Sequence, residues 1–177
     1  MAVGVLVKRR KKFKVTTDSN HVKPLFDNVL DRDFAPNGSD QAYVQDITYI
    51  WTQEGWLYLA TVIDLYSRRI VGWSMGSRMT AQLVCDALTM AIWQRQPKAG
   101  LIVHSDGGSQ YASKAYRRLL KAHDFVGSMS RGSTGHNELY YDVVQLSLRL
   151  HSYLGYKSPN QFEIEMKMPR LELKKAS

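Results

Sequence analysis

The sequence predicts an α/β protein built on one mixed sheet, in which three antiparallel strands precede two parallel ones and helices flank the sheet. Two observations lead to this prediction. The first segments with strand-like composition are joined by short connections, which is typical of an antiparallel meander. The segments after them alternate between helical and strand-like patterns, which favours parallel pairing with right-handed crossovers.

The first half of the expected sheet is the meander. Aromatic and β-branched residues predict strands over residues 42–50, 56–65 and 70–75. The sequence TQEG supplies a tight turn after the first strand, and SRR follows the second. These short connections make antiparallel pairing of consecutive strands the expected arrangement.

The second half alternates helices with strands. Apolar residues recur at helical spacing over residues 80–96 and 113–123, and Thr80 can cap the first of these helices. Residues 101–104 and 125–129 are the expected fourth and fifth strands. This order of elements is the ribonuclease H-like arrangement, provided that the first strand lies beside the fourth.

The charge of the chain indicates an anionic partner. Its 177 residues include 24 basic and 16 acidic side chains, a formal net charge of +8. Nucleic acid is the commonest partner of a chain with such an excess of positive charge. A basic domain that binds no nucleic acid is the alternative. Cys85 is the only cysteine, which excludes an internal disulfide and a thiolate zinc cluster. No apolar stretch approaches the roughly 18 residues of a membrane helix, so we expect a cytoplasmic protein with no membrane partner.

Two aspartates stand on the strands that are expected to adjoin. Asp46 lies in the apolar and aromatic run QDITYI, and Asp106 ends the fourth strand in HSDGGSQYAS. Two carboxylates within about 4 Å repel by about 4 kcal/mol at an effective dielectric constant of 20, and a divalent cation reverses the sign of that energy. Mg²⁺ prefers oxygen ligands and keeps several waters that phosphate oxygens can replace. We therefore expect Asp46 and Asp106 to be catalytic metal ligands, with Gly107 and Gly108 letting a DNA backbone approach.

Each acid taken alone also has an ordinary structural interpretation. Asp46 could pair with an arginine or cap a turn, and Asp106 could cap a helix or bind a loop. Asp64, in VIDLYSRRIVGW, is a rival acid on the second strand. Its expected role is structural, as the partner of Arg68 or Arg69 across the turn.

Basic side chains on the second expected helix are candidates for DNA binding. They recur at helical spacing near the proposed site and could hold phosphates, with an affinity that falls steeply as salt rises. A solvated helix face is the alternative. The candidates are Lys114, Arg117, Arg118 and Lys121.

The large aromatic residues and one histidine are expected to pack rather than to bind ligands. His104 shares the face of Asp106 and is expected to be a packed, hydrogen-bonded side chain. Packing in the core or on a sheet face, rather than base stacking, is expected for Trp51, Trp56, Trp73 and Trp93.

Four segments together resemble the transposases of bacterial insertion sequences, which contain a retroviral-integrase-like catalytic core of the DDE superfamily. They are FKVTTDSNH, QDITYIWTQEGWLYLATVIDLYSRRIVGWSM, LIVHSDGGSQYAS and RLHSYLGYKSPNQFE, within residues 13–131 and 149–163. The resemblance implies a ribonuclease H-like fold and a triad of two aspartates and a glutamate that holds Mg²⁺ or Mn²⁺. It also implies cleavage of DNA at transposon ends by water and joining by a 3′-hydroxyl. Asp46 and Asp106 stand where the family has its first two acids.

The third acid of the family has no clear counterpart. The family's spacing, counted from Asp106, lands on Asp142, and a helix capped by Asn137 would place Glu138 one turn away on the same face. In a competing alignment, YYD is the tyrosine-rich segment that precedes RLHS, and the third-acid helix is deleted. The second alignment is favoured because the region before RLHS is much shorter than in the family. Asp142 is therefore a catalytic candidate with a side chain one methylene shorter than glutamate.

The resemblance also divides the chain. Residues 1–40 are expected to be a basic, largely irregular extension, 41–148 an integrase-like core that is incomplete at its end, and 149–177 the family tail. The family's helix-turn-helix region precedes the core, so the expected protein is a truncated, internally deleted transposase core with impaired catalysis. The alternatives are a non-catalytic DNA-binding remnant and a pseudogene product. The expected partners are DNA, as transposon ends and target, and a second copy or an intact transposase.

Overall fold

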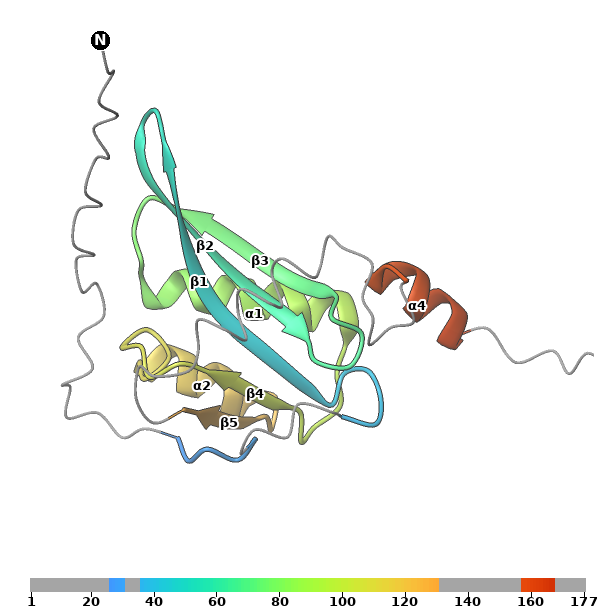
Figure 1. Ribbon diagram of the computed structural model, residues 1–177. Coiled ribbons are helices and arrows are strands. Elements are labelled where there is room, and N and C mark those ends of the chain that lie inside the picture. Colours follow the sequence, from blue (N-terminus) through green and yellow to red (C-terminus); the bar gives the residue numbers. More distant parts are fainter. Residues whose placement is uncertain (1–25, 31–35, 131–156, 168–177) are drawn as a thin grey trace, which may run out of the picture.

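The computed structural model describes residues 26–30, 36–130 and 157–167. Within these residues, one mixed sheet has the strand order β3-β2-β1-β4-β5 (Figure 1). The strands are β1 Ala42–Thr52, β2 Gly55–Asp64, β3 Ile70–Gly76, β4 Ile102–Ser105 and β5 Val126–Met129. The helices are α1 Ala81–Arg95, α2 Lys114–Ala122 and α4 Pro159–Lys167.

The pairing of the strands confirms the predicted ribonuclease H-like class. Strand β2 pairs antiparallel with both β1 and β3, whereas β4 pairs parallel with both β1 and β5. The first strand therefore lies beside the fourth, which is the condition on which the sequence prediction rested. None of the helices in the described ranges has the length and apolar character needed to cross a membrane. The proposed division at residues 40 and 148 stays a prediction, because much of the flanking chain lies outside the described ranges.

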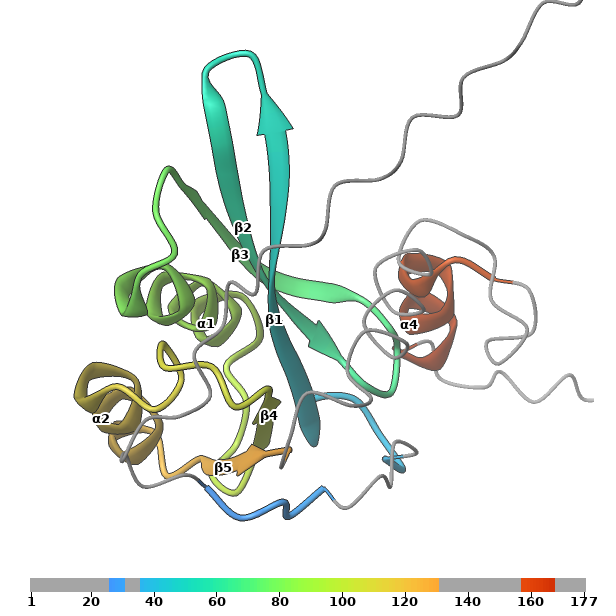
Figure 2. The same ribbon diagram turned by 60° about the vertical axis from the view of Figure 1, so that its left-hand side comes forward.

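Helices α1 and α2 cover one face of the sheet and enclose the main core (Figure 2). Helix α1 is capped at its start by Thr80, whose Oγ1 accepts the Leu83 N–H at 3.2 Å. The helix lies so close to β3 that a Cβ atom at Gly72 would be 2.3 Å from the Ala87 carbonyl oxygen. Glycine is therefore required for this approach. The core includes Tyr43, Val62, Leu88, Val103 and Tyr116.

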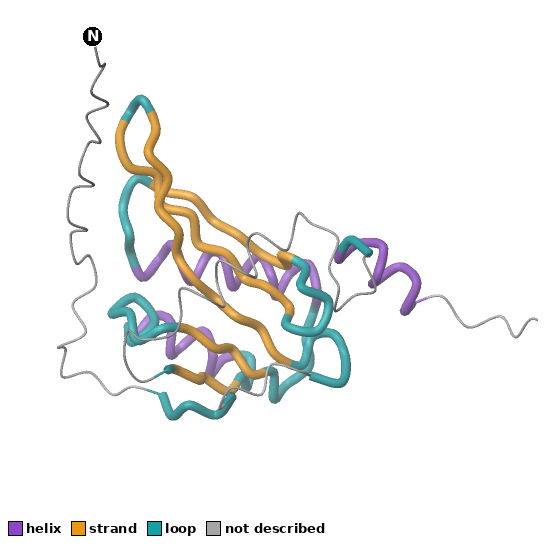
Figure 3. Tube along the Cα trace, in the orientation of Figure 1, coloured by secondary structure: helices purple, strands orange, loops and turns teal. Residues whose placement is uncertain are grey.

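The β1–β2 hairpin projects beyond the helices, as Figures 1 and 3 show. Its tip carries Trp51 and Trp56, which are opposite each other in register with ring centroids 4.9 Å apart. These two rings do pack on a sheet face, but none of the described helices covers them. Packing in the core was one of the two expected arrangements for the tryptophans, and none of the four side chains is in the core. Their exposed fractions are 67% for Trp51, 49% for Trp56, 46% for Trp73 and 80% for Trp93.

A buried ion-pair network attaches α4 to the sheet, and sequence analysis assigned no helix there. Glu163 of α4 is 2% exposed and accepts hydrogen bonds from Arg95 Nη1 at 2.7 Å, Ser67 Oγ at 2.7 Å and Arg69 Nη1 at 2.9 Å. Arg95 also donates to both oxygens of Asp40, at 2.8 and 3.0 Å. The tail segment therefore completes the charge balance of a buried arginine.

Asp64 is structural, as expected, but its partners differ from the expected ones. Its carboxylate accepts the backbone N–H groups of Asp40 and Ser67, each at 2.9 Å, and its Oδ2 lies 2.7 Å from the Ser67 hydroxyl oxygen, which stands between Asp64 and Glu163. Arg69 forms its ion pair with Glu163 instead. The reason is that the tight turn after β2 brings Ser67 back onto the carboxylate, while the side chain of Arg69 extends toward α4.

Candidate functional site

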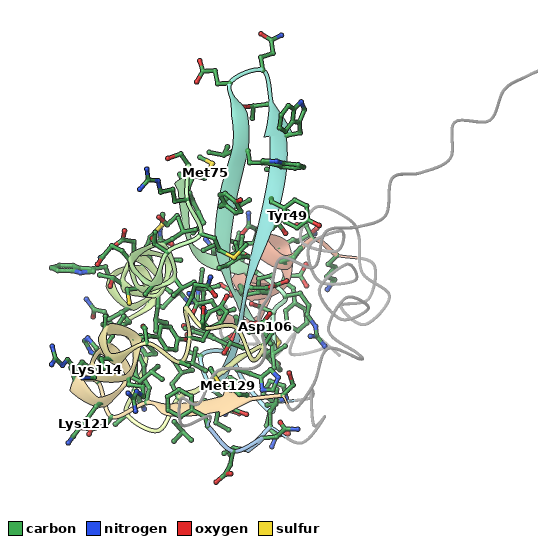
Figure 4. The ribbon with its side chains drawn as sticks, turned by 90° about the vertical axis from the view of Figure 1, so that its left-hand side faces the viewer. Tyr49, Met75, Asp106, Lys114, Lys121 and Met129 are labelled. Carbon is green, nitrogen blue, oxygen red and sulfur yellow. The ribbon has the colours of Figure 1, made fainter. Side chains whose placement is uncertain are left out.

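Asp46 and Asp106 are brought together by the parallel pairing of β1 with β4. Val44 pairs with His104 and Gln45 with Ser105. The next residue on β1 is Asp46, and the residue directly after β4 is Asp106. Burial and the negative charge of Asp106 raise the pKa of Asp46 from 3.8 to about 7. The two carboxylates therefore act on each other electrostatically. Figure 4 shows Asp106 in the middle of the molecule, beside the lower part of the sheet.

Each carboxylate is oriented by a backbone N–H close to it in sequence. Asp46 Oδ1 accepts the N–H of Ile47 at 2.7 Å, and Asp106 Oδ1 accepts the N–H of Gly108 at 2.9 Å. A Cβ atom at Gly108 would lie 2.8 Å from Asp106 Oδ1. Gly108 is buried, so its part in this structure is to let the Asp106 carboxylate approach the backbone. At Gly107, a Cβ atom would meet only the Ser130 carbonyl oxygen at 3.8 Å.

The chemistry of this pair suits a hard divalent cation. Burial, together with the nearby negative charge of Asp106, favours the protonated form of Asp46 until a cation compensates its charge. Two carboxylates provide oxygen ligands of the kind that Mg²⁺ prefers and leave most of its coordination positions for water or substrate. No third histidine, cysteine or acid joins them within the described part of the chain. Asp142 and Glu138, the candidates for the third acid, lie outside the described residues.

His104 has the packed role that was expected. The side chain is 5% exposed, and its Nδ1 lies 2.9 Å from Ser128 Oγ on β5. Ser128 Oγ also accepts the N–H of Leu30 at 3.1 Å. The histidine thus links β4 to Ser128 of β5, whose hydroxyl in turn binds the backbone of residues 26–30.

The structure does not gather the basic residues of α2 around the two acids. Tyr116 of α2 donates to Gln45 Oε1 at 2.7 Å, so the helix packs on the sheet face that carries Gln45. Asp46 is the next residue on β1, and its side chain points to the opposite face. Figure 4 shows Lys114 and Lys121 on the outer side of α2, away from Asp106. Arg118 is exposed and Arg117 is half-buried.

One polar residue near the acids was missed by sequence reasoning. Thr61 on β2 is directly opposite Asp46 in the antiparallel register. The side chain is buried at 3% exposure, and its hydroxyl has no hydrogen-bond partner among the described residues. The signal was present in the sequence, because the TQEG turn pairs Thr52 with Gly55 and thereby sets the register of the whole hairpin.

The sequence of this chain is similar to a known protein family and to several known proteins. Residues 36–133 match the family model described as "Integrase core domain". The chain is 50% identical over 127 residues to "Transposase InsF for insertion sequence IS3A" of Escherichia coli (strain K12), an alignment that covers 72% of this chain and 44% of that protein. It is 42% identical over 156 residues to "Insertion element IS600 uncharacterized 31 kDa protein" of Shigella sonnei, which covers 88% of this chain and 57% of that protein.

The fold is also found among solved structures. The dimeric form of the HTLV-2 integrase catalytic core domain in complex with magnesium superposes with a TM-score of 0.51 at 15% identity. The match covers 74% of this chain and 78% of that chain. A likeness at this identity shows the fold, and it agrees with the strand order described above.

Proposed function

Because the chain belongs to the integrase core domain family, we propose that it is a transposase catalytic core that cuts and joins DNA phosphodiester bonds with Mg²⁺ or Mn²⁺. The observation that supports this proposal most directly is the pairing of β1 with β4, which sets Asp46 level with Asp106. The matched InsF relative is a transposase, and this chain spans 44% of its length. The activity of the whole relative is therefore part of the proposal.

Asp46 and Asp106 are the residues that would hold the ion. When bound, a divalent cation neutralises the two carboxylates, polarises a phosphoryl oxygen and lowers the pKa of a bound water. The N–H groups of Ile47 and Gly108 fix the directions in which the two carboxylates present their oxygens. Asp142 is proposed as the third catalytic acid on the basis of the family spacing.

The substrate and partners are proposed on the same grounds. DNA, as the ends of the element and as the target, suits a chain with a formal net charge of +8. Phosphate contacts are proposed for the α2 residues Lys114, Arg117, Arg118 and Lys121. Association with a second copy, or with an intact transposase, is proposed because the HTLV-2 integrase core is found in a dimeric form.

The test is DNA nicking and strand transfer on supercoiled plasmid in the presence of Mn²⁺. We expect the full chain to relax or join the plasmid and Asp106→Asn to abolish the reaction. The matched control is Asp86→Asn, which makes the same chemical change at an exposed position on α1. If the unmodified chain shows neither nicking nor joining, the catalytic proposal is wrong.

A second candidate is a DNA-binding protein without catalytic activity. It is favoured by the lack of a third metal-ligating side chain beside Asp46 and Asp106 in the described part of the chain. This candidate predicts DNA binding that weakens steeply with salt and is not followed by cleavage. Binding that does not change from low to moderate salt would exclude it.

A further inference from the structure

A row of side chains crosses three strands at the level of the site. Asp46 on β1 is opposite Thr61 on β2, and Thr61 is opposite Trp73 on β3. Residues directly opposite in antiparallel strands share one face of the sheet, with their Cβ atoms about 4.5–5.5 Å apart. Thr61 is therefore the immediate neighbour of Asp46 on the side away from Asp106.

The hydroxyl of Thr61 is a buried donor without an acceptor. Its Oγ1 is shielded from water and makes no hydrogen bond within the described residues. Buried polar side-chain atoms nearly always have a partner, so an exception calls for an explanation. The hydroxyl of Thr52, on the same hairpin, has one: it donates to the Gly55 carbonyl oxygen at 2.8 Å.

Asp46 offers an acceptor close to this donor. Its Oδ1 is bound by the N–H of Ile47, and a carboxylate can accept further hydrogen bonds through its second oxygen. The unpaired donor and this acceptor thus belong to side chains that are neighbours across two strands. A rotation about the Cα–Cβ bond of Thr61 redirects its O–H without moving the backbone.

We propose that Thr61 is a positioning residue, whose hydroxyl donates to the Asp46 carboxylate and holds it in the orientation that binds the divalent cation. This inference rests on the proposed function. A hydrogen bond from a hydroxyl to an ionised carboxylate is charge-assisted, which makes it shorter and stronger than a neutral one. Carboxylates that bind metals are commonly held by such outer partners, and removing a partner typically weakens metal affinity roughly 10–100-fold.

The test is Mn²⁺ binding to the full chain, measured by isothermal titration calorimetry, with three variants. Thr61→Val keeps the shape of the side chain and removes the donor, and we expect its Mn²⁺ affinity to fall roughly 10–100-fold. Thr61→Ser keeps the donor, and we expect it to recover most of the affinity. Thr52→Val makes the same change where the hydroxyl has its own partner, and we expect no change in Mn²⁺ affinity.

Melting of the metal-free protein separates positioning from folding. Because the Thr61 hydroxyl has no partner there, Thr61→Val should melt at the same temperature as the unmodified chain or higher. If Thr61→Val does not fold, Thr61→Ala, which also lacks the donor, is used in its place.

The inference is overturned if the variant without the donor binds Mn²⁺ as tightly as the unmodified chain, or if Thr61→Ser binds as weakly as Thr61→Val. In both cases the metal site itself would stand. If the unmodified chain binds no Mn²⁺, the proposed function fails and this inference fails with it.

Discussion

Asp46 and Asp106 directly follow Gln45 and Ser105, which pair in the parallel register of β1 and β4, and the charge of Asp106 adds to burial in raising the Asp46 pKa to about 7. The fold thus holds two acids in a place where they destabilise each other in the absence of a cation. Such an arrangement lowers stability and is typical of a functional site. The effect of the Asp46 carboxyl group can therefore be measured from the pH dependence of stability and of metal affinity, without an assay of activity.

The first prediction concerns the stability of the metal-free protein. The unfolded chain releases the Asp46 proton near pH 3.8 and the folded chain near 7, so the folded state holds an extra proton between these values. Stability should therefore fall as the pH rises through this window, by up to about 4 kcal/mol. Asp46→Asn removes this loss. We expect the variant to melt above the unmodified chain at pH 8 and at about the same temperature at pH 4, and a lower melting point at pH 8 would contradict the prediction.

The second prediction concerns competition between protons and metal. Below pH 7, a bound Mn²⁺ must displace the proton of Asp46, so its affinity should rise with pH by up to about tenfold per unit. Above about pH 7 the dependence on this group should level off. Calorimetric titrations from pH 5.5 to 8.5 would test this. An affinity that is constant across the range would show that Asp46 is not a ligand.

The fold and the pair of acids could be predicted from the sequence because both depend on the order of the elements. Three strands with short connections, followed by alternation, indicate this class of fold, and the structure meets its condition that β4 lies beside β1. Asp46 and Asp106 then directly follow the paired residues Gln45 and Ser105. Thr61 was missed although the turn residues set its register. The approach of Gly108 to Asp106 depends on loop coordinates that residue patterns do not encode.

Two further features depended on distances in three dimensions. The aromatic pattern of β1 and β2 predicts strands correctly. It does not reveal that the hairpin extends beyond the ends of the helices and leaves Trp51 and Trp56 exposed. The network of Asp40, Arg95 and Glu163 joins residues from distant parts of the sequence. Nothing local marks Glu163 as buried, because a charge on a short helix is usually solvent-exposed.

The third prediction tests the support of Asp106. Gly108→Ala adds a Cβ atom that would lie 2.8 Å from Asp106 Oδ1 and 3.1 Å from Gln110 Oε1, so the carboxylate must move. A displacement of about 1 Å in a catalytic group can cost on the order of 10²-fold in rate. We expect a loss of that order in Mn²⁺-dependent nicking. The control is Gly76→Ala at the end of β3, where the added Cβ atom would meet Leu83 Cδ1 at an ordinary 3.4 Å, and equal losses in the two variants would contradict the steric explanation.

The fourth prediction concerns the attachment of α4. Burial alone would raise the Glu163 pKa, but hydrogen bonds from Ser67, Arg95 and Arg69 outweigh it and lower the pKa. Its ionised form therefore stabilises the fold above the ordinary value of 4.5, and this stabilisation is lost as the pH falls through the folded-state pKa. Glu163→Gln should cost about 1.5–3 kcal/mol in unfolding free energy at pH 7, because Arg95 loses a charged partner but keeps Asp40 as its counter-charge.

Glu165 offers a matched control on the same helix. It is exposed and paired with the exposed Lys157, and surface pairs of this kind contribute about 0–1 kcal/mol. Denaturant unfolding of Glu163→Gln and Glu165→Gln should therefore separate clearly. Equal unfolding free energies in the two variants would mean that α4 is not held by the Glu163 network.

The last prediction decides whether the basic face of α2 contacts DNA. Lys114, Arg118 and Lys121 are exposed on that helix, and each phosphate contact contributes about one unit to the slope of log affinity against log salt. Changing all three to glutamine should reduce the slope by about three units if each cation meets a phosphate. Lys98, exposed in the turn before β4, is the matched control, and Lys98→Gln should leave the slope unchanged. A triple variant with an unchanged slope would mean that these α2 side chains do not contact DNA and that other basic residues bind it. That outcome would agree with the packing of α2 on the sheet face opposite to the one that carries Asp46.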